Sequence, residues 1–419
     1  MSEKKDKNFW LNVLDGSIFG AASNMLPYVI LLPAFIKKFT SNEYLINLIP
    51  AISIFGVAFP QIFIAKYVAN LKYKKNSMLI TGLFQRIPWL ILAVLTFYYN
   101  YFNKKFFIFI FYLCFTICIL TMGINIPAWI DLVAKVVPVK KRGELFAYRE
   151  ALGGIMGLGT TYLGRFILKN LDFPFNYSFL FFLFFVITSI SLTFLIFIDE
   201  KSESKIMENK DLISYMKYTI KILKNDKLFL KYIFVIIILS LSAIAGGLIT
   251  AYAIDQFSLQ KKDFIFAQMS FINVIAKISF VFFIGWIADK YGHKINLVLE
   301  GLLMLIGFVL LLLFNHILTI YIYFALSTIA NSARIISNKN ILLEFCSESQ
   351  RATYISISNT ISAPFSFIAP FIGSYVAKNY GYKSLFIVSI FLYLIYIIFT
   401  IILIKEPRKK IKFVNIDFK

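Results

Sequence analysis

The sequence contains few of the residues that form disulfide frameworks, metal sites or charged catalytic centres. Its 419 residues include three cysteines, two histidines and only 22 acidic side chains, against 43 of Lys and Arg. Cys114, Cys118 and Cys346 fit neither a disulfide framework nor the ligand spacing of a metal site. His293 and His316 both lie in short polar stretches between apolar runs, so neither is placed to act as a ligand or proton relay inside one. We therefore expect no metal site and no cofactor.

The abundant residues are apolar. Hydrophobic side chains make up 59% of the chain and aromatic ones 18%, and the mean hydropathy is +0.76. A soluble chain of this length would expose too much apolar surface, so the lipid bilayer is its natural solvent. The net charge of +21 could suggest nucleic acid, but the basic residues cluster at the ends of apolar runs, as topology signals do. We expect membrane lipids, and no nucleic acid, as partners.

The apolar runs predict the fold class. A helix needs about 20 apolar residues to cross the hydrocarbon core. Twelve runs qualify, at roughly 9–36, 44–69, 77–99, 106–132, 144–168, 178–198, 229–254, 263–288, 295–315, 317–342, 352–377 and 383–404. The sequence thus predicts an all-α integral membrane protein with twelve transmembrane helices in two six-helix bundles. The predicted parts are an N-terminal bundle over 1–198, a cytoplasmic linker with an amphipathic helix over 199–228, a C-terminal bundle over 229–405 and a basic cytoplasmic tail over 406–419.

Charge predicts the orientation in the membrane. With twelve spans, both termini lie on the same side. Most of the Lys and Arg residues outside the spans fall in the termini, the linker and the loops of that side. The positive-inside rule therefore predicts a multi-pass protein of the cell inner membrane with both termini in the cytoplasm.

The two halves of the sequence resemble each other. Residues 142–171 align with 351–380 without a gap at a shift of 209 residues, so that Arg142 falls on Arg351 and Gly164 on Gly373. Small residues also coincide along one helix face, a pattern that lets membrane helices approach closely. Because the shift carries span five onto span eleven, we interpret the halves as duplicated bundles. Paired bundles around a midplane site are typical of secondary transporters.

One polar stretch stands out, GWIADKYGHK at 285–294. Placed between spans eight and nine, it resembles the Gly-x-Leu-Ala-Asp-Arg-x-Gly-Arg-Arg loop motif of the major facilitator superfamily; the matching residues are Gly285, Ala288, Asp289, Lys290, Gly292 and Lys294. The resemblance implies that fold, with Asp289 holding the start of span eleven near Arg351 while the cytoplasmic side is closed. A carboxylate is favoured at a helix N-terminus, which makes this role physically sound. A plain tight turn is the alternative.

The first half lacks most of this motif. In AKYVANLKYK, residues 65–74, Ala65 and Lys72 stand at the glycine positions and Ala69 stands at the acid. We call the expected contact between Asp289 and the start of span eleven the latch. Since the first-half loop lacks the acid, we expect the latch to be asymmetric, with its acid in the second half only. The family's antiporter motif in span five is only half present, because the glycines of 153–159 are not followed by proline. Drug–proton antiport is thus permitted but not indicated.

Charges inside spans are expensive and mark functional sites by default. The first half has five toward its predicted cytoplasmic side: Asp15, Arg86, Asp131, Arg149 and Glu150. Their opposite signs predict an ion-pair network at the inner gate. The alternative is that they carry protons or bind the substrate directly. Asp15 and Glu150 are the preferred proton carriers. The second half holds Lys277, Glu300, Arg334 and Lys339 inside spans.

Polar residues at helical spacing predict a central substrate cavity. Ser327, Asn331, Arg334 and Asn338 form one polar face of span ten, and the repeat carries it onto span four. The candidate cavity residues are Asn24, Tyr28, Thr121, Asn125, Trp129, Asn273, Lys277, Asn331, Arg334 and Asn338. Because Lys277 and Arg334 are both cations, an anionic or zwitterionic substrate is favoured.

These patterns predict a secondary-active transporter and not an enzyme. No P-loop is present, and no sizeable loop carries a histidine, paired acids or a metal cluster. We expect a monomer that moves a small-molecule substrate by alternating access, coupled to a proton or another ion, with import and export both open. A lipid flippase and a non-transporting sensor on the same fold are the alternatives.

Overall fold

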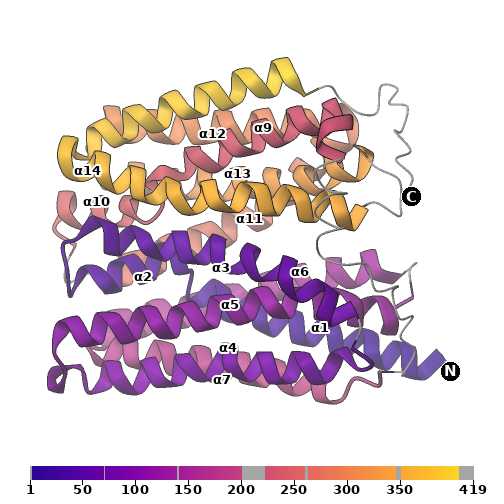
Figure 1. Cartoon of the computed structure of the whole chain (residues 1–419). Helices are drawn as coiled ribbons and strands as arrows, with labels where there is room; N and C mark the ends of the chain where they lie inside the picture. The colour runs from indigo at the N-terminus through magenta and orange to yellow at the C-terminus, as the bar shows by residue number, and fades with distance from the viewer. Residues whose placement is uncertain are drawn as a thin grey trace. The chain divides into compact units, whose positions relative to one another are not determined.

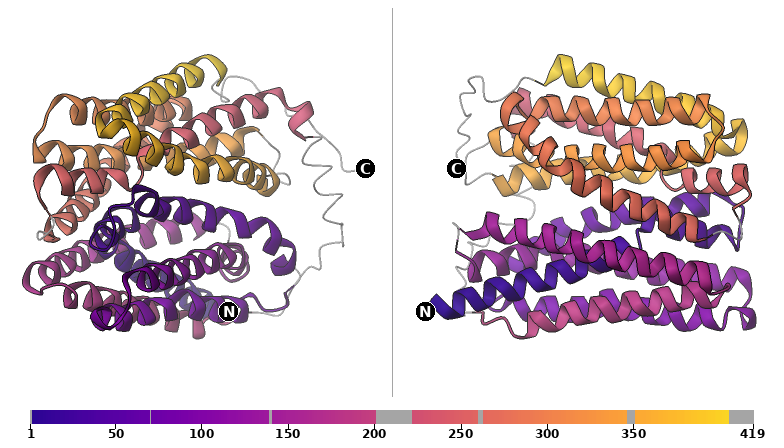
Figure 2. Two further views of the ribbon diagram at one scale, coloured as in Figure 1. Left: turned by 60° about the vertical axis from the view of Figure 1, so that its left-hand side comes forward. Right: turned by 180° about the vertical axis from the view of Figure 1, so that it is seen from behind.

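The computed structural model describes residues 2–69, 71–138, 141–200, 222–259, 263–345 and 351–404. Within these ranges the chain is helical and contains no strand (Figures 1 and 2). It forms two compact units, unit 1 from the described residues of Met1–Met207 and Ile254–Val274, and unit 2 from those of Glu208–Ala253 and Ile275–Lys419. The sequence placed residues 254–274 in the C-terminal bundle, whereas by their contacts they group with unit 1.

Unit 1 holds the helices of the first half and the adjoining ends of two later ones. Its own helices are α1 (Ser2–Met25), α2 (Tyr28–Lys37), α3 (Glu43–Ala69), α4 (Lys74–Phe97), α5 (Lys104–Val136), α6 (Arg142–Asn170) and α7 (Phe175–Ile196). The break between α1 and α2 falls at Pro27, whose backbone is extended and which has no N–H to continue a helix. The two pieces together form the first membrane span, Asp6–Lys37.

Unit 2 holds most of the second half. Its helices are α9 (Lys227–Ser242), the short η3 (Ala243–Ala245), α12 (His293–Leu313), α13 (Ile317–Phe345) and α14 (Arg351–Leu403), while the residues of α10 (Leu248–Phe257) and α11 (Phe264–Tyr291) are divided between unit 1 and unit 2. Helix α14 bends at Gly381, where φ is +82°, a conformation that favours glycine. The bend divides the 47-residue apolar stretch Ile357–Leu403 into two crossings.

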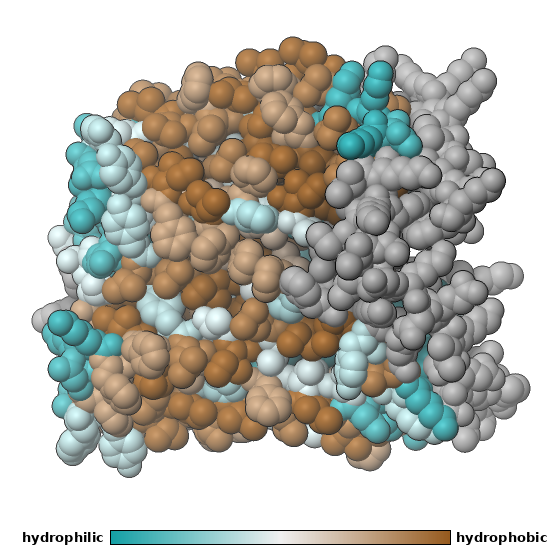
Figure 3. Space-filling view, in the orientation of Figure 1, coloured by the Kyte–Doolittle hydropathy of each residue, from teal (hydrophilic) through white to brown (hydrophobic). Residues whose placement is uncertain are grey.

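The predicted fold class is confirmed. Nine described segments are long and apolar enough to cross a membrane. Helices α6 and α13, each of 29 residues, have the length but carry polar and charged side chains such as Arg149 and Arg334. With these two and the second arm of α14, the chain has the twelve predicted spans. On the face drawn in Figure 3, apolar side chains cover the middle of the helices, and polar ones gather near their ends.

Small residues set the closest helix contacts in both units. In unit 1, α1 packs on α6, where a Cβ at Gly153 would lie 3.3 Å from the Ser17 carbonyl oxygen. In unit 2, the first arm of α14 packs on α9 and η3, and a Cβ at Gly373 would lie 1.9 Å from the Ile244 carbonyl oxygen. The face of small residues found in the sequence repeat is therefore the contact face in each unit.

Candidate functional site

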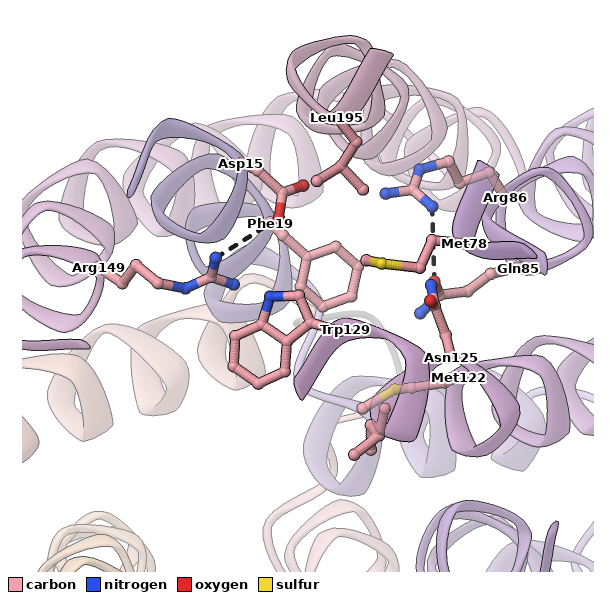
Figure 4. Close-up of a pocket in the computed structure, with 11 residues that line it drawn as sticks. Asp15, Phe19, Met78, Gln85, Arg86, Met122, Asn125, Trp129, Arg149 and Leu195 are labelled. Atoms are coloured by element: carbon pink, nitrogen blue, oxygen red, sulfur yellow. Dashed lines mark hydrogen bonds and ion pairs between the residues drawn. The ribbon is translucent and has the colours of Figure 1, made fainter. Parts of the chain in front are cut away.

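A cavity of about 140 Å³ lies among α1, α4, α5, α6 and α7 in unit 1 (Figure 4). It is lined by Asp15, Phe19, Met78, Gln85, Arg86, Met122, Asn125, Ile126, Trp129, Arg149 and Leu195. Three of these lining residues carry charge, and each is mostly or fully buried. An apolar cavity with a few convergent polar groups is the usual form of a small-molecule site.

The central feature of the cavity wall is an ion pair between α1 and α6. Asp15 Oδ2 lies 3.5 Å from Arg149 Nη1, and Ser191 on α7 donates a 2.7 Å hydrogen bond to Asp15 Oδ1. The same Arg149 nitrogen donates to the Asn12 carbonyl oxygen at 2.6 Å, and the guanidinium lies 4.7 Å from the Trp129 ring centre. Asp15 and Arg149 are thus held by several partners each. Breaking such a buried pair by removing one partner costs about 3–5 kcal/mol.

Gly16 makes room for this pair and was not singled out in the sequence. A Cβ at Gly16 would lie 1.9 Å from the Arg149 Cζ atom, so any side chain there would push the guanidinium out of place. The signal was available in the sequence as a glycine directly after an acid inside a span. Without an arginine known to face it, however, that glycine has no distinguishing feature.

Three of the five predicted gate charges line the cavity, and two do not. Asp15, Arg86 and Arg149 line the cavity together. Arg86 is 4% exposed and donates to the carbonyl oxygens of Thr188 at 2.6 Å and Gly82 at 2.9 Å. Asp131 instead lies 3.9 Å from Lys74, away from the cavity lining, and Glu150 is exposed on α6. Of the two preferred proton carriers, only Asp15 is buried beside the cavity.

Three predicted cavity residues have buried polar atoms without a hydrogen-bond partner. These atoms are Asn125 Oδ1, Trp129 Nε1 and Asn273 Oδ1. Buried polar groups in proteins are nearly always paired, with water or a ligand where the protein itself offers nothing. Asn125 and Trp129 both face the cavity (Figure 4). They are the strongest candidates for direct contact with a bound solute.

The other first-half candidates are less exposed to the cavity. Tyr28 stacks on Trp89 with ring centres 5.6 Å apart, in a cluster of aromatic side chains. The Thr121 hydroxyl donates to the Ile117 carbonyl oxygen one turn back at 2.7 Å. Asn24 faces Gly157, where a Cβ would lie 2.4 Å from its Nδ2 atom. None of the three is among the residues that line the described cavity.

In unit 2 the polar face of α13 meets an acid that was not assigned a role from the sequence. Glu300 on α12 is 4% exposed, and its Oε1 lies 3.7 Å from Arg334 Nε. Arg334 also donates to Asn331 Oδ1 at 2.5 Å, while the Tyr232 hydroxyl bonds to Asn338. Lys277 is exposed on α11. From the sequence alone, Glu300 is recognisable only as a charge within a span.

The loop motif covers the end of α11, the single non-helical residue Gly292 and the start of α12. Gly292 has φ +96°, which favours glycine, and α12 begins at the next residue. Lys290 lies 4.8 Å from the Trp286 ring centre, and Lys294 donates to the Ile401 carbonyl oxygen at 2.7 Å. Gly285 lies within α11 with open space around it. The side chains of Asp289 and Arg351 fall outside the described residues, so the latch between them stays a prediction.

An acid that follows α7 interacts with the start of α4, next to the first-half loop. Glu200 accepts hydrogen bonds from the backbone N–H groups of Lys74 at 2.9 Å and Lys75 at 2.8 Å, at the start of α4. It also pairs with Lys135 Nζ at 3.0 Å, and its side chain is 1% exposed. A carboxylate is stabilised at a helix N-terminus in this way. The sequence assigned Glu200 to the linker 199–228, of which residues 201–221, with most of the predicted amphipathic helix, lie outside the described ranges.

A second charged cluster joins the end of α2 to residues 254–274 within unit 1. Lys37 Nζ lies 2.7 Å from Asp255 Oδ2, and Lys38 Nζ lies 2.8 Å from Asp263 Oδ2. Tyr177 donates to the other Asp263 oxygen at 3.4 Å. Burial raises the pKa of Asp263, and the Lys38 ammonium acts in the opposite direction. Removing either Lys38 or Asp263 should therefore lower the stability of the protein.

In the described part of the chain, no group of three or more His, Cys, Asp or Glu side chains could hold a metal ion. The cavity, with its unpartnered polar atoms, is suited to binding a small solute.

Comparison with known proteins identifies the family. A sequence model of the Major Facilitator Superfamily matches residues 16–272 and 249–416, nearly the whole chain. The chain belongs to this superfamily. As a member, it is a multi-pass membrane transporter and not an enzyme, as the sequence predicted. No curated protein matches this chain significantly in sequence.

Solved structures of other transporters share the superfamily fold. A D-xylose–proton symporter is 14% identical with a TM-score of 0.74, covering 96% of this chain and 99% of its own. A POT family transporter in complex with 5-aminolevulinic acid is 13% identical with a TM-score of 0.70, over 95% and 94% of the two chains. The nucleoside transporter NupG is 11% identical with a TM-score of 0.66, over 96% and 98%. At these identities the similarity concerns the fold.

Proposed function

We propose that this protein is a proton-coupled secondary transporter of a small solute that works by alternating access, with both termini in the cytoplasm. The observation that carries the proposal is the cavity of unit 1, where a buried ion pair lies beside polar atoms that have no partner. The superfamily fold supports transport as such. The buried carboxylates of the two units support coupling to protons, because a carboxyl group in a low-dielectric site binds protons readily.

The residues of the cavity have distinct proposed roles. Asn125 and Trp129 hold the solute, because their unpaired polar atoms face the cavity. The Asp15–Arg149 pair ties α1 to α6 and, through Ser191, to α7. It keeps the wall of the cavity in shape, since each member has further partners that fix its position.

Uptake into proteoliposomes tests this function. Purified protein would be reconstituted and offered labelled sugars, nucleosides, amino acids and organic acids, with and without an imposed pH gradient. We expect at least one solute to accumulate only with the gradient. Asn125→Ala should weaken uptake at least several-fold, because it removes a cavity group. Asn170→Ala is the matched control, since Asn170 is exposed at the end of α6 and bonds only to its own helix turn in the described contacts.

Two results would contradict the proposal. Solute uptake that is independent of the gradient at every pH would indicate a uniporter. Scrambling of a fluorescent lipid in the same liposomes, without any solute uptake, would indicate a flippase.

A further inference from the structure

The second acid–arginine pair, in unit 2, differs from the first in its freedom to change partner. Glu300 is buried among α12, α13 and α14, and its side chain is only 6% exposed, whereas that of Arg334 is 45% exposed. The two are 3.7 Å apart, longer than an ideal charged hydrogen bond. The Tyr396 hydroxyl donates to the second carboxylate oxygen at 3.2 Å. The acid is thus enclosed, while its cation reaches open space.

Comparison with the first pair shows what this difference means. Arg149 is 16% exposed and is held by a backbone carbonyl and an aromatic ring as well as by its acid. Arg334 shares its guanidinium only between Glu300 and Asn331 in the described contacts, and Asn331 is itself exposed. Arg149 would have to give up a carbonyl and a ring contact to bind an anion. In the described contacts Arg334 would have to give up only Glu300 or Asn331, so an anion arriving from its open side can reach it more easily.

The open side of Arg334 is polar. Ser327, Asn331 and Asn338 lie on the same face of α13 as Arg334. A charged and polar helix face is expensive in contact with lipid, so such faces line a water-accessible path. A planar guanidinium at such a place is suited to bidentate recognition of a carboxylate or phosphate.

We propose that Arg334 binds an anionic group of the transported solute and that Glu300 takes up the proton that accompanies it. The inference rests on the proposed transport function and deepens it by naming a substrate class and a coupling residue. In the unloaded state Glu300 is ionised and paired with Arg334. The anionic group displaces the Glu300 carboxylate from the guanidinium, and Glu300 binds one proton from water. When the solute leaves, the proton leaves as well and the pair forms again.

The surroundings of Glu300 favour this exchange. The ionisable side chains that interact with it in the described part of unit 2 are Arg334 on α13, Tyr393 and Tyr396 on α14 and Tyr232 on α9. Arg334 is the single cation among them, so a carboxylate that loses it would stay buried without compensation, a strongly unfavourable state. Proton uptake is the alternative. By linkage, protonation must then strengthen anion binding by the same factor by which the anion strengthens protonation.

A thermal-shift binding assay on the full-length protein tests the inference. The probes are small carboxylates, dicarboxylates and phosphate monoesters, each beside its uncharged amide or alcohol counterpart. We expect an anionic probe to stabilise the wild-type protein and its uncharged counterpart to have no such effect. Because one proton binds with each anion, affinity should rise about tenfold per pH unit of acidification while unloaded Glu300 is ionised.

Variants separate the two roles. Glu300→Gln should keep anion binding and lose its pH dependence, because the amide needs no proton. Arg334→Gln should lose anion binding and be less stable, and Glu300→Gln combined with Arg334→Gln should recover the stability without the binding. Glu144→Gln removes an exposed acid of α6 and should change neither property. An infrared band of a protonated carboxyl that titrates in the wild-type protein should be missing in Glu300→Gln.

Several results would overturn the inference: full anion binding in Arg334→Gln, an unchanged pH dependence in Glu300→Gln, an unchanged infrared titration in that variant, or no preference for anions in the wild-type protein. Binding of uncharged solutes alone would contradict the anion site and leave the transport function standing. A protein that neither binds nor moves any solute would contradict the transport function itself.

Discussion

Individual glycines decide how closely the helices of each unit approach. Gly164 and Gly373 occupy equivalent positions of the repeat, yet their surroundings differ. A Cβ at Gly164 would meet the flexible Met25 side chain at 3.2 Å, whereas one at Gly373 would meet the Ile244 backbone oxygen at 1.9 Å. Because a backbone atom cannot rotate away, the two positions should tolerate substitution very differently.

We expect Gly373→Ala to destabilise the protein by on the order of 1–3 kcal/mol, as overpacked contacts do. The helix would have to move away from η3. Thermal unfolding of the purified protein measures the effect. Gly159→Ala is the matched control, because a Cβ there would meet nothing within 4 Å, and it should leave stability unchanged or slightly raised. Equal unfolding temperatures for the two variants would contradict the contact.

At the scale of elements, ion pairs fix the end of α2 against residues 254–274. The two pairs there differ in burial. The side chain of Asp263 is 8% exposed, while that of Asp255 is 44% exposed. Exposed pairs contribute little to stability, but a buried acid that loses its cation is costly.

We expect Lys38→Met to lower stability more as the pH rises. The pKa of Asp263 is raised by burial, so the folded state binds its proton more tightly than the unfolded state does. Its contribution to stability is therefore present at low pH and is lost as pH rises through the folded pKa. Without Lys38 the charged carboxylate has lost its cation, and the loss should deepen. Unfolding temperatures measured at several pH values between about 4 and 8 test this.

Two further variants sharpen that test. Lys37→Met removes the partner of the more exposed acid and should have a small effect at every pH. Lys38→Met combined with Asp263→Asn should abolish the added pH dependence. The proposed pairing would be wrong if Lys37→Met and Lys38→Met lost stability equally across the pH range.

The elements were largely predictable from sequence, and the exceptions have physical causes. Apolar runs of sufficient length gave the spans, because the bilayer thickness imposes their length. Apolar runs do not reveal helix breaks such as the one at Pro27, because the apolar sequence continues on both sides of the break. The role of Glu200 was missed because it depends on a backbone terminus far away in sequence, at Lys74. The role of Glu300 depends equally on an arginine of another helix.

At the scale of the whole molecule, the loop motif 285–294 is predicted to act on the rate of switching between states. Asp289→Asn should slow transport while leaving solute affinity within a few-fold, because the residue lies in the last turn of α11, beside the break at Gly292, where the motif is expected to hold the closed state. Transport rates and binding affinities of the variant and the wild-type protein would be compared. Complete loss of binding would show that Asp289 contributes to the solute site itself.

The candidate site was predictable in composition more than in arrangement. Intramembrane charges and polar helix faces predicted Asp15, Arg149, Asn125 and Arg334 as site residues. Such groups are costly inside membrane spans and are rare there unless they have a function. The sequence could not show that Asp131 lies apart from the cavity, paired with Lys74, since that depends on which way each helix faces. Helix rotation is set by packing between elements, which one sequence without a structure does not define.

Proton movement driven by solute is the most direct test of the account. Proteoliposomes loaded with a pH-sensitive dye would receive a solute that the protein binds, with no proton gradient imposed. We expect the internal pH to change as solute enters, at a fixed ratio of protons to solute, and the rate of change to fall at least several-fold in the Asn125→Ala variant, in proportion to its uptake. Solute entry at full rate with no change of internal pH would contradict proton-coupled transport.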